Sequence, residues 1–143
     1  MLQMRVLKGI LLLILCILTV HDLATKRLPR GWLVMALLAG GAGFLLQPGP
    51  GGTFLECASF LPGAFFLLMS YLTKGQIGRG DGIVLLAIGG LTGLGQCMLA
   101  LSLALLIAAF TAGCLMVFRG SSRKARLPFV PFLTMGYLAG ILI

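Results

Sequence analysis

Acidic residues and histidine are the scarcest functional groups in this sequence. The 143 residues include three acids, Asp22, Glu56 and Asp81, and one histidine, against eleven lysines and arginines. The four cysteines lie within apolar segments, and no two of them form a Cys-x-x-Cys pair. Metal sites need clustered cysteine, histidine or carboxylate ligands, and disulfide frameworks need cysteines outside lipid-like segments. We therefore expect no metal site, no disulfide framework and no cofactor.

Long polar stretches are also missing, and apolar runs take their place. Hydrophobic residues make up 59% of the chain, and the mean hydropathy is +1.12. Such runs span membranes as helices, and none has the alternating pattern of a membrane barrel. We predict an all-α fold, a membrane bundle of about six transmembrane helices, with residues 1–143 as a single domain. The runs are Leu7–Ala24, Trp32–Gln47, Phe54–Thr73, Ile83–Gly95, Gln96–Phe118 and Phe129–Ile143.

Basic residues gather in three of the connections between these runs. They follow the first, third and fifth runs, whereas the connections after the second and fourth runs have none. By the positive-inside rule, the basic loops are cytoplasmic and both termini lie outside. The net charge of +8 therefore indicates topology and contact with anionic membrane lipids, and it does not favour nucleic acid as a partner. The bases are Lys26, Arg27, Arg30, Lys74, Arg79, Arg119, Arg123, Lys124 and Arg126.

Two of the three acids lie at the cytoplasmic ends of runs. Asp22 lies near the end of the first run, and Asp81 lies where the glycine-rich segment Gly75–Gly82 enters the fourth. With this topology both face the same side of the membrane at similar depth, so they could meet. Two neighbouring carboxyl groups share one proton, and the charged one acts as general base on water. This is the chemistry of an aspartyl protease. Glu56 falls on the opposite side and cannot join the pair.

Each aspartate also has a simpler explanation. Asp81 follows Gly80 and could be the N-cap of the next helix, satisfying free backbone amides. Asp22 near a helix C-terminus opposes the helix dipole, and Lys26 or Arg27 one turn later could offset this. The two aspartates taken together, in a chain with one other acid, favour a shared function.

Three motifs resemble those of a known family. Gly78-Arg79-Gly80-Asp81 resembles the GxGD signature of membrane-embedded aspartyl proteases. Residues 22–29, with the sequence DLATKRLP, are similar to the first-aspartate motif of the type IV prepilin peptidases. Residues 127–132, with the sequence LPFVPF, are similar to the proline and aromatic motif that opens the last span of that family. The motifs occur in the family's order and cover nearly the whole chain.

The resemblance implies a leader peptidase of the bacterial inner membrane with its active site facing the cytoplasm. Family members remove the short basic leader of prepilin-like proteins, and Asp22 and Asp81 match the two catalytic aspartates. Gly78 and Gly80 match a flexible loop that lets Asp81 approach the substrate, which suits the permissive dihedral angles of glycine. The partners implied are prepilin or pseudopilin substrates.

The third motif and two departures bear on the substrate. If the resemblance holds, Pro128 and Pro131 shape the substrate cleft; otherwise they only mark the start of the last helix. Family members commonly have lysine where this chain has Ile83, and often asparagine where it has Arg30. These changes affect which substrate is recognised more than whether the enzyme is active. Longer members add an N-terminal domain linked to methylation, so we expect peptidase activity without methyltransferase activity.

Two other functions stay open on the sequence alone. A small ion-coupled transporter subunit would use the acids as an ion or proton relay, but it would place them near the midplane of the membrane. A non-catalytic assembly component of a pilus or secretion system would keep the fold and lose an aspartate, and both aspartates are present. The pilin or pseudopilin substrate and the oligomeric state are not defined by the sequence.

Overall fold

In the computed structural model the described residues form helices joined by short turns, which confirms the prediction of an all-α fold. It describes residues 2–25, 29–46, 52–74, 78–119 and 128–143. No β-strand occurs within these ranges. The helices are α1 (Leu2–Thr25), α2 (Arg30–Leu46), α3 (Gly52–Ala58), α4 (Leu61–Leu72), α5 (Arg79–Arg119) and α6 (Val130–Leu142).

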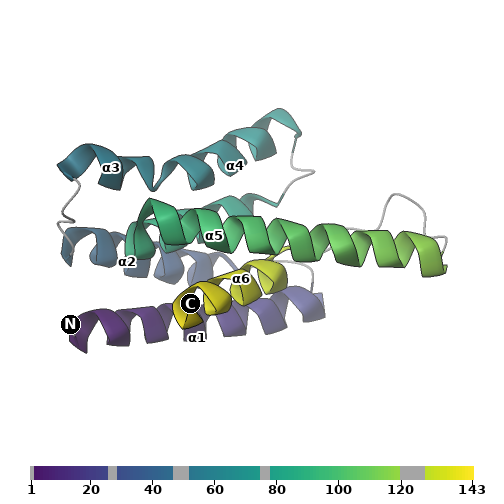
Figure 1. The fold of residues 1–143 in the computed structure, drawn as a ribbon, viewed down its shortest axis with the longest axis horizontal. Helices are drawn as coiled ribbons and strands as arrows, with labels where there is room; N and C mark the ends of the chain where they lie inside the picture. The colour runs from purple at the N-terminus through teal and green to yellow at the C-terminus, as the bar shows by residue number, and fades with distance from the viewer. Residues whose placement is uncertain (1, 26–28, 47–51, 75–77, 120–127) are drawn as a thin grey trace.

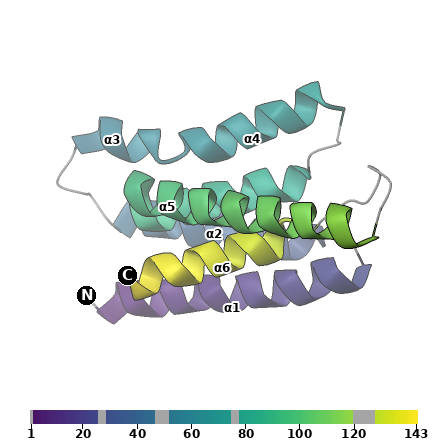
Figure 2. The same cartoon turned by 45° about the vertical axis from the view of Figure 1, so that its right-hand side comes forward.

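The helices run up and down in a single bundle (Figure 1). At one end of the bundle lie the last turns of α1 and α4 and the first turns of α2 and α6. Both the start and the finish of α5 lie there too, because this helix turns back in its middle. We call this the basic end, because the exposed residues Arg30, Lys74 and Arg79 lie there. Both chain termini lie toward the other end, which we call the opposite end, and Figure 2 shows the same order from a second direction. The three connections predicted to share one side of the membrane therefore share one end of the bundle.

α5 consists of two helices joined at Gly93. This residue has φ 80° and ψ 173°, a conformation that side chains rarely adopt and that glycine tolerates. The chain reverses there, and the Cys97 thiol donates a 3.8 Å hydrogen bond to the Leu85 carbonyl oxygen across the hairpin. The fourth and fifth apolar runs thus form a helical hairpin. Its turn lies at Gly93, slightly before the predicted boundary after Gly95.

The third apolar run is interrupted where the sequence predicted one continuous span. α3 ends at Ala58 and α4 begins at Leu61, with Pro62 in the first turn of α4. Proline has no backbone N–H to donate and its ring clashes with the carbonyl of the preceding turn, so it ends a helix. Between the two helices, the Ser59 hydroxyl donates a 2.6 Å hydrogen bond to the Glu56 carbonyl oxygen. Pro62 is the physical reason for the break.

Small residues allow close contact between several helices. A Cβ atom on Gly40 would lie 2.6 Å from the Ala87 carbonyl oxygen, and one on Gly136 would overlap the carbonyl of Ala100. Helices approach this closely only where the residues at the contact are small, here glycine against alanine. At Gly113 and Gly140 a Cβ would meet nothing within 4 Å. Glycine therefore serves close packing in α2 and in the first part of α6, and it does not do so at Gly113 and Gly140.

Two helices are long and apolar enough to cross a membrane, α1 over Arg5–Thr25 and α5 over Arg79–Phe118. The apolar helices over Arg30–Leu46, Glu56–Leu72 and Val130–Leu142 are shorter. Because α5 turns back at Gly93, its length is shared between two parts. Six transmembrane helices therefore stay a prediction.

Candidate functional site

Asp22 lies in the last turn of α1 and points into the bundle. Its side chain is 8% exposed, and it continues a buried stripe of Leu11, Leu15 and Leu18. Residues at these three- and four-residue intervals share one face of a helix. Its exposed neighbour His21 points elsewhere, and the His21 Nδ1 atom lies 3.1 Å from the Thr25 hydroxyl oxygen. A solvated ion-pairing residue would lie on the outer face, so burial argues against the simpler explanation of Asp22. Lys26 and Arg27 lie outside the described residues.

Asp81 lies inside the first turn of α5, and not at its N-cap. The helix begins at Arg79, and the backbone N–H of Asp81 donates a 3.2 Å hydrogen bond to the Gly78 carbonyl oxygen. The N-cap explanation of Asp81 is therefore wrong, although an acid in the first turn still interacts favourably with the helix dipole. The side chain is half-buried.

Asp22 and Asp81 lie at the same end of the bundle, the basic end, in the last turn of α1 and the first turn of α5. They are near enough for electrostatic repulsion between the two carboxylates. Glu56, the third acid, lies on α3 at the opposite end. The arrangement can share a proton between two carboxyl groups and activate a water molecule next to them.

Gly78, in the second motif, provides space where the sequence suggested flexibility. Gly78 precedes α5, and Gly80 is a buried residue within it. In the described residues, positive φ angles occur at Lys74 and Gly93, so neither motif glycine uses a special conformation. A Cβ on Gly78 would instead lie 2.7 Å from Oδ2 of Asp81. Gly78 makes room for the Asp81 carboxyl group.

Gly82, directly after Asp81, lets α5 approach α4. A Cβ there would lie 3.1 Å from the Leu67 backbone nitrogen. This contact places the start of α5 against the middle of α4.

The proline and aromatic segment lies at the same end of the bundle. Pro128 precedes α6, Pro131 lies in its first turn, and both are half-buried. Phe129 stacks on Phe66 of α4, with ring centroids 5.9 Å apart and planes inclined by 23°. The start of α6 is thereby fixed against α4.

A hydrogen bond connects α6 to α1 close to Asp22. The hydroxyl oxygens of Thr19 and Thr134 are 2.8 Å apart. Neither threonine belongs to one of the three motifs, and neither was predicted to be part of the site. Threonine within an apolar helix commonly bonds its own backbone, so the sequence alone held no signal for this contact.

A family model for the type IV leader peptidases matches residues 9–116, well over half of the chain. The chain belongs to the type IV leader peptidase family. The matched segment contains Asp22 and the whole Gly78-Arg79-Gly80-Asp81 motif, and it ends before Pro128. No curated protein and no solved structure matches the chain.

Membership of the leader peptidase family makes the chain a peptidase and, together with its apolar helices, a membrane protein. It also accounts for the exposed apolar side chains that cover the bundle, such as Leu38 and Phe110. In a bilayer these side chains contact lipid tails, which are as apolar as leucine itself.

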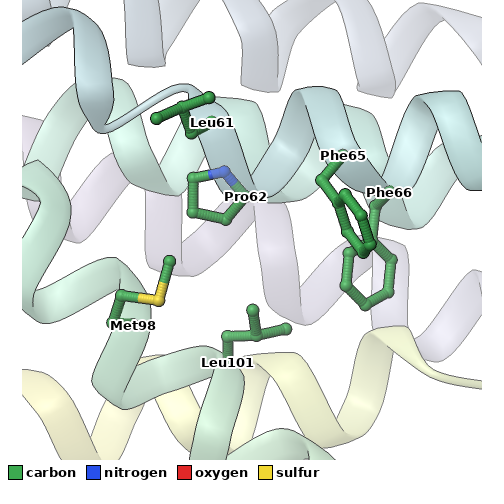
Figure 3. Close-up of a pocket in the computed structure, with 6 residues that line it drawn as sticks. All are labelled: Leu61, Pro62, Phe65, Phe66, Met98 and Leu101. Carbon is green, nitrogen blue, oxygen red and sulfur yellow. The ribbon is translucent and has the colours of Figure 1, made fainter.

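A cavity of about 290 Å³ lies on another face of this leader peptidase, between α4 and the second part of α5. Figure 3 shows its lining, which is apolar throughout and contains no group that could bind or activate a polar substrate. We do not assign the candidate site to it. The lining residues are Leu61, Pro62, Phe65, Phe66, Met98 and Leu101.

Proposed function

We propose that this chain is an aspartyl endopeptidase that removes the basic leader from type IV prepilin-like proteins. Asp22 and Asp81 are the catalytic residues, and they act on the cytoplasmic side of a bacterial inner membrane. The observation that supports this most directly is that the two aspartates, far apart in the sequence, lie at the same end of the bundle, in the last turn of α1 and the first turn of α5.

The proposed reaction needs only the two carboxyl groups and water. One carboxylate accepts a proton from water, which attacks the carbonyl carbon of the scissile peptide bond. The other carboxyl group, still protonated, donates a hydrogen bond to the carbonyl oxygen and stabilises the charge that develops there. A proton then passes to the leaving amine, and the peptide bond breaks. Gly78 gives Asp81 the room for these steps, because no side chain competes for that space.

The membrane arrangement proposed is six spans with the basic end in the cytoplasm. The first and second spans are α1 and α2. The third span consists of α3 and α4 together, and the two parts of α5 are the fourth and fifth spans. The last span is α6. The exposed bases at this end support the orientation, by the positive-inside rule. They also suit anionic lipid headgroups as neighbours. Pro128 and Pro131 shape the entrance to the site from α6.

An ion-coupled transporter subunit is less well supported. It requires ionisable groups near the midplane of the membrane. Asp22 and Asp81 lie at helix ends, and the middle of the bundle is occupied by apolar side chains such as Leu15 and Ile88. A non-catalytic assembly component would have no need of a paired, partly buried set of carboxyl groups.

The decisive experiment is cleavage in membranes. The chain is co-expressed with a panel of prepilin-like and pseudopilin-like substrates, and mass spectrometry reads their N-termini. We expect leader removal by the wild type, and a loss of at least about a thousandfold in Asp22→Ala and Asp81→Ala, because neither carboxyl group can act alone. Glu56→Gln is the matched control and should keep wild-type activity. Cleavage by either aspartate variant at the wild-type rate would refute the pair.

A further inference from the structure

The contact between Thr19 and Thr134 is a polar link in an otherwise apolar interface of α1 and α6. The two hydroxyl oxygens are 2.8 Å apart. Each also lies 2.8 Å from the carbonyl oxygen of its own helix four residues earlier, Leu15 for Thr19 and Val130 for Thr134. Both side chains are half-buried. A hydroxyl in such surroundings needs a hydrogen-bond partner, so the link is favoured once the helices pack.

The two threonine hydroxyl groups have too few hydrogens to make a hydrogen bond at every short contact. Two hydroxyl groups have two hydrogens, yet three short oxygen–oxygen contacts compete for them. One threonine therefore donates to its own backbone carbonyl while the other donates across to its partner. Either threonine can be the one that donates across, and the interhelical hydrogen bond is present in both cases. The two cases differ in whether the Leu15 or the Val130 carbonyl oxygen receives no hydrogen bond from the threonine hydroxyl. Valine has the same shape without the hydroxyl and would remove the link altogether.

The position of Asp22 depends on this interface. Thr19 and Asp22 are three residues apart and share one face of α1. α1 has α6 and α2 as its main neighbours, whereas α6 packs most extensively on α5, the helix that contains Asp81. α2 also packs on both α1 and α5, so the placement of Asp22 relative to Asp81 is transmitted through α6 and α2. The threonine link lies one helical turn from Asp22 on the path through α6.

The start of α6 is fixed on its other side as well. Phe129 stacks on Phe66 of α4, and Leu67, the next residue in α4, lies against Gly82 beside Asp81. A chain of contacts therefore runs from the second aspartate through α4 and α6 to α1. The threonine pair is its last step before the first aspartate.

We propose that Thr19 and Thr134 are positioning residues that hold the Asp22 carboxyl group opposite Asp81. They set the height and rotation of the end of α1 against α6. Their effect on cleavage rests on the proposed function, whereas their effect on the distance between the two helix ends does not. Neither threonine contacts the substrate in this proposal.

The test uses the full chain in detergent or nanodiscs and has two readouts. For the first, the four native cysteines are replaced and spin labels are attached to cysteines at the exposed positions His21 and Arg79, next to the two aspartates. The distance distribution is measured in the parent, Thr134→Val, Thr134→Ser and Thr111→Val. Thr111→Val is the matched control, because Thr111 makes the same 2.8 Å bond to its own helix, at the Ile107 carbonyl oxygen.

We expect a shifted or broader distribution in Thr134→Val, and the parental distribution in Thr134→Ser and Thr111→Val. The second readout is cleavage kinetics in the unlabelled proteins. A displacement of about 1 Å at a catalytic group is enough to slow chemistry by one to two orders of magnitude, so kcat should fall about tenfold in Thr134→Val while KM is unchanged. Serine should restore kcat, because it restores the hydroxyl group.

Two results would overturn the proposal. One is a distance distribution in Thr134→Val that matches the parent. The other is a loss of activity that serine does not restore, which would indicate a packing role for the methyl group. If the wild type cleaves no substrate at all, the proposed function fails, and the distance measurement still decides whether the threonine pair positions Asp22.

Discussion

Asp22 and Asp81 lie at the basic end of the bundle, in the last turn of α1 and the first turn of α5, whereas Glu56 lies on the short helix α3 at the opposite end. Glycine serves different purposes at the two ends. At the basic end, Gly78 leaves space for a carboxyl group, and at the opposite end Gly93 lets the backbone reverse. Glycine thus accommodates a functional side chain at the basic end and permits a reversal of the backbone at the opposite end. Substitutions of the same kind at the two ends should therefore have different consequences.

The largest difference is expected between Gly78→Ala and Gly95→Ala. The new Cβ at residue 78 would lie 2.7 Å from Asp81 Oδ2, so the carboxyl group must rotate away. Because the atom displaced is the free end of a side chain, the fold should survive while kcat falls about a hundredfold. At Gly95 a Cβ meets nothing within 4 Å. Cleavage rates and thermal unfolding of both variants would check this, and equal activity in the two would remove the special role of Gly78.

A second comparison concerns two glycines of α6. In Gly136→Ala the added methyl group meets the backbone of Ala100, which cannot move aside without separating α6 from α5. We expect the free energy of unfolding in detergent to fall by about 1–3 kcal/mol. In Gly140→Ala the methyl group meets open space, and alanine's helix preference should leave stability unchanged or raise it by up to about 1 kcal/mol. Equal losses in both variants would contradict the packing described for α6.

The smallest difference is expected between two aromatic pairs. Phe129 stacks on Phe66 at the basic end, and Phe44 meets Phe60 edge-on at 5.2 Å nearer the opposite end. Phe129→Leu and Phe44→Leu should each cost about 0.5–1.5 kcal/mol of stability, measured by unfolding. Only Phe129→Leu should also lower cleavage, by a few-fold, because α6 positions the site. Comparable activity losses in both variants would show that the ends are not functionally distinct.

Much of this architecture could be predicted from the sequence, because apolar runs indicate where the helices lie and the charges of the loops indicate which helix ends share a side of the membrane. The sequence located the apolar segments, and the charge of the loops placed Asp22 and Asp81 at one end. It did not predict that Pro62 would divide the third run, because a proline inside an apolar run can either end a helix or only kink a continuous one.

The contacts of the site were harder to predict than its residues. Gly78 was expected to supply a flexible backbone, yet its role depends on an oxygen of Asp81 that only the folded chain places there. The link between Thr19 and Thr134 depends on two distant helices having the same height and rotation. A sequence motif identifies the residues that carry out the chemistry. It does not identify the residues of other helices that hold them in position.

The turn at Gly93 has a consequence for the order in which the molecule is assembled. The two parts of α5 are adjacent in the sequence, so their hairpin closes locally and at low entropic cost, taking Asp81 with it. Asp22 lies on α1, which precedes this hairpin in the chain, whereas α6, which contacts both α1 and α5, follows it. In a nascent chain the hairpin of α5 can therefore form before α6 is available to contact α1 and support the end of the helix that contains Asp22.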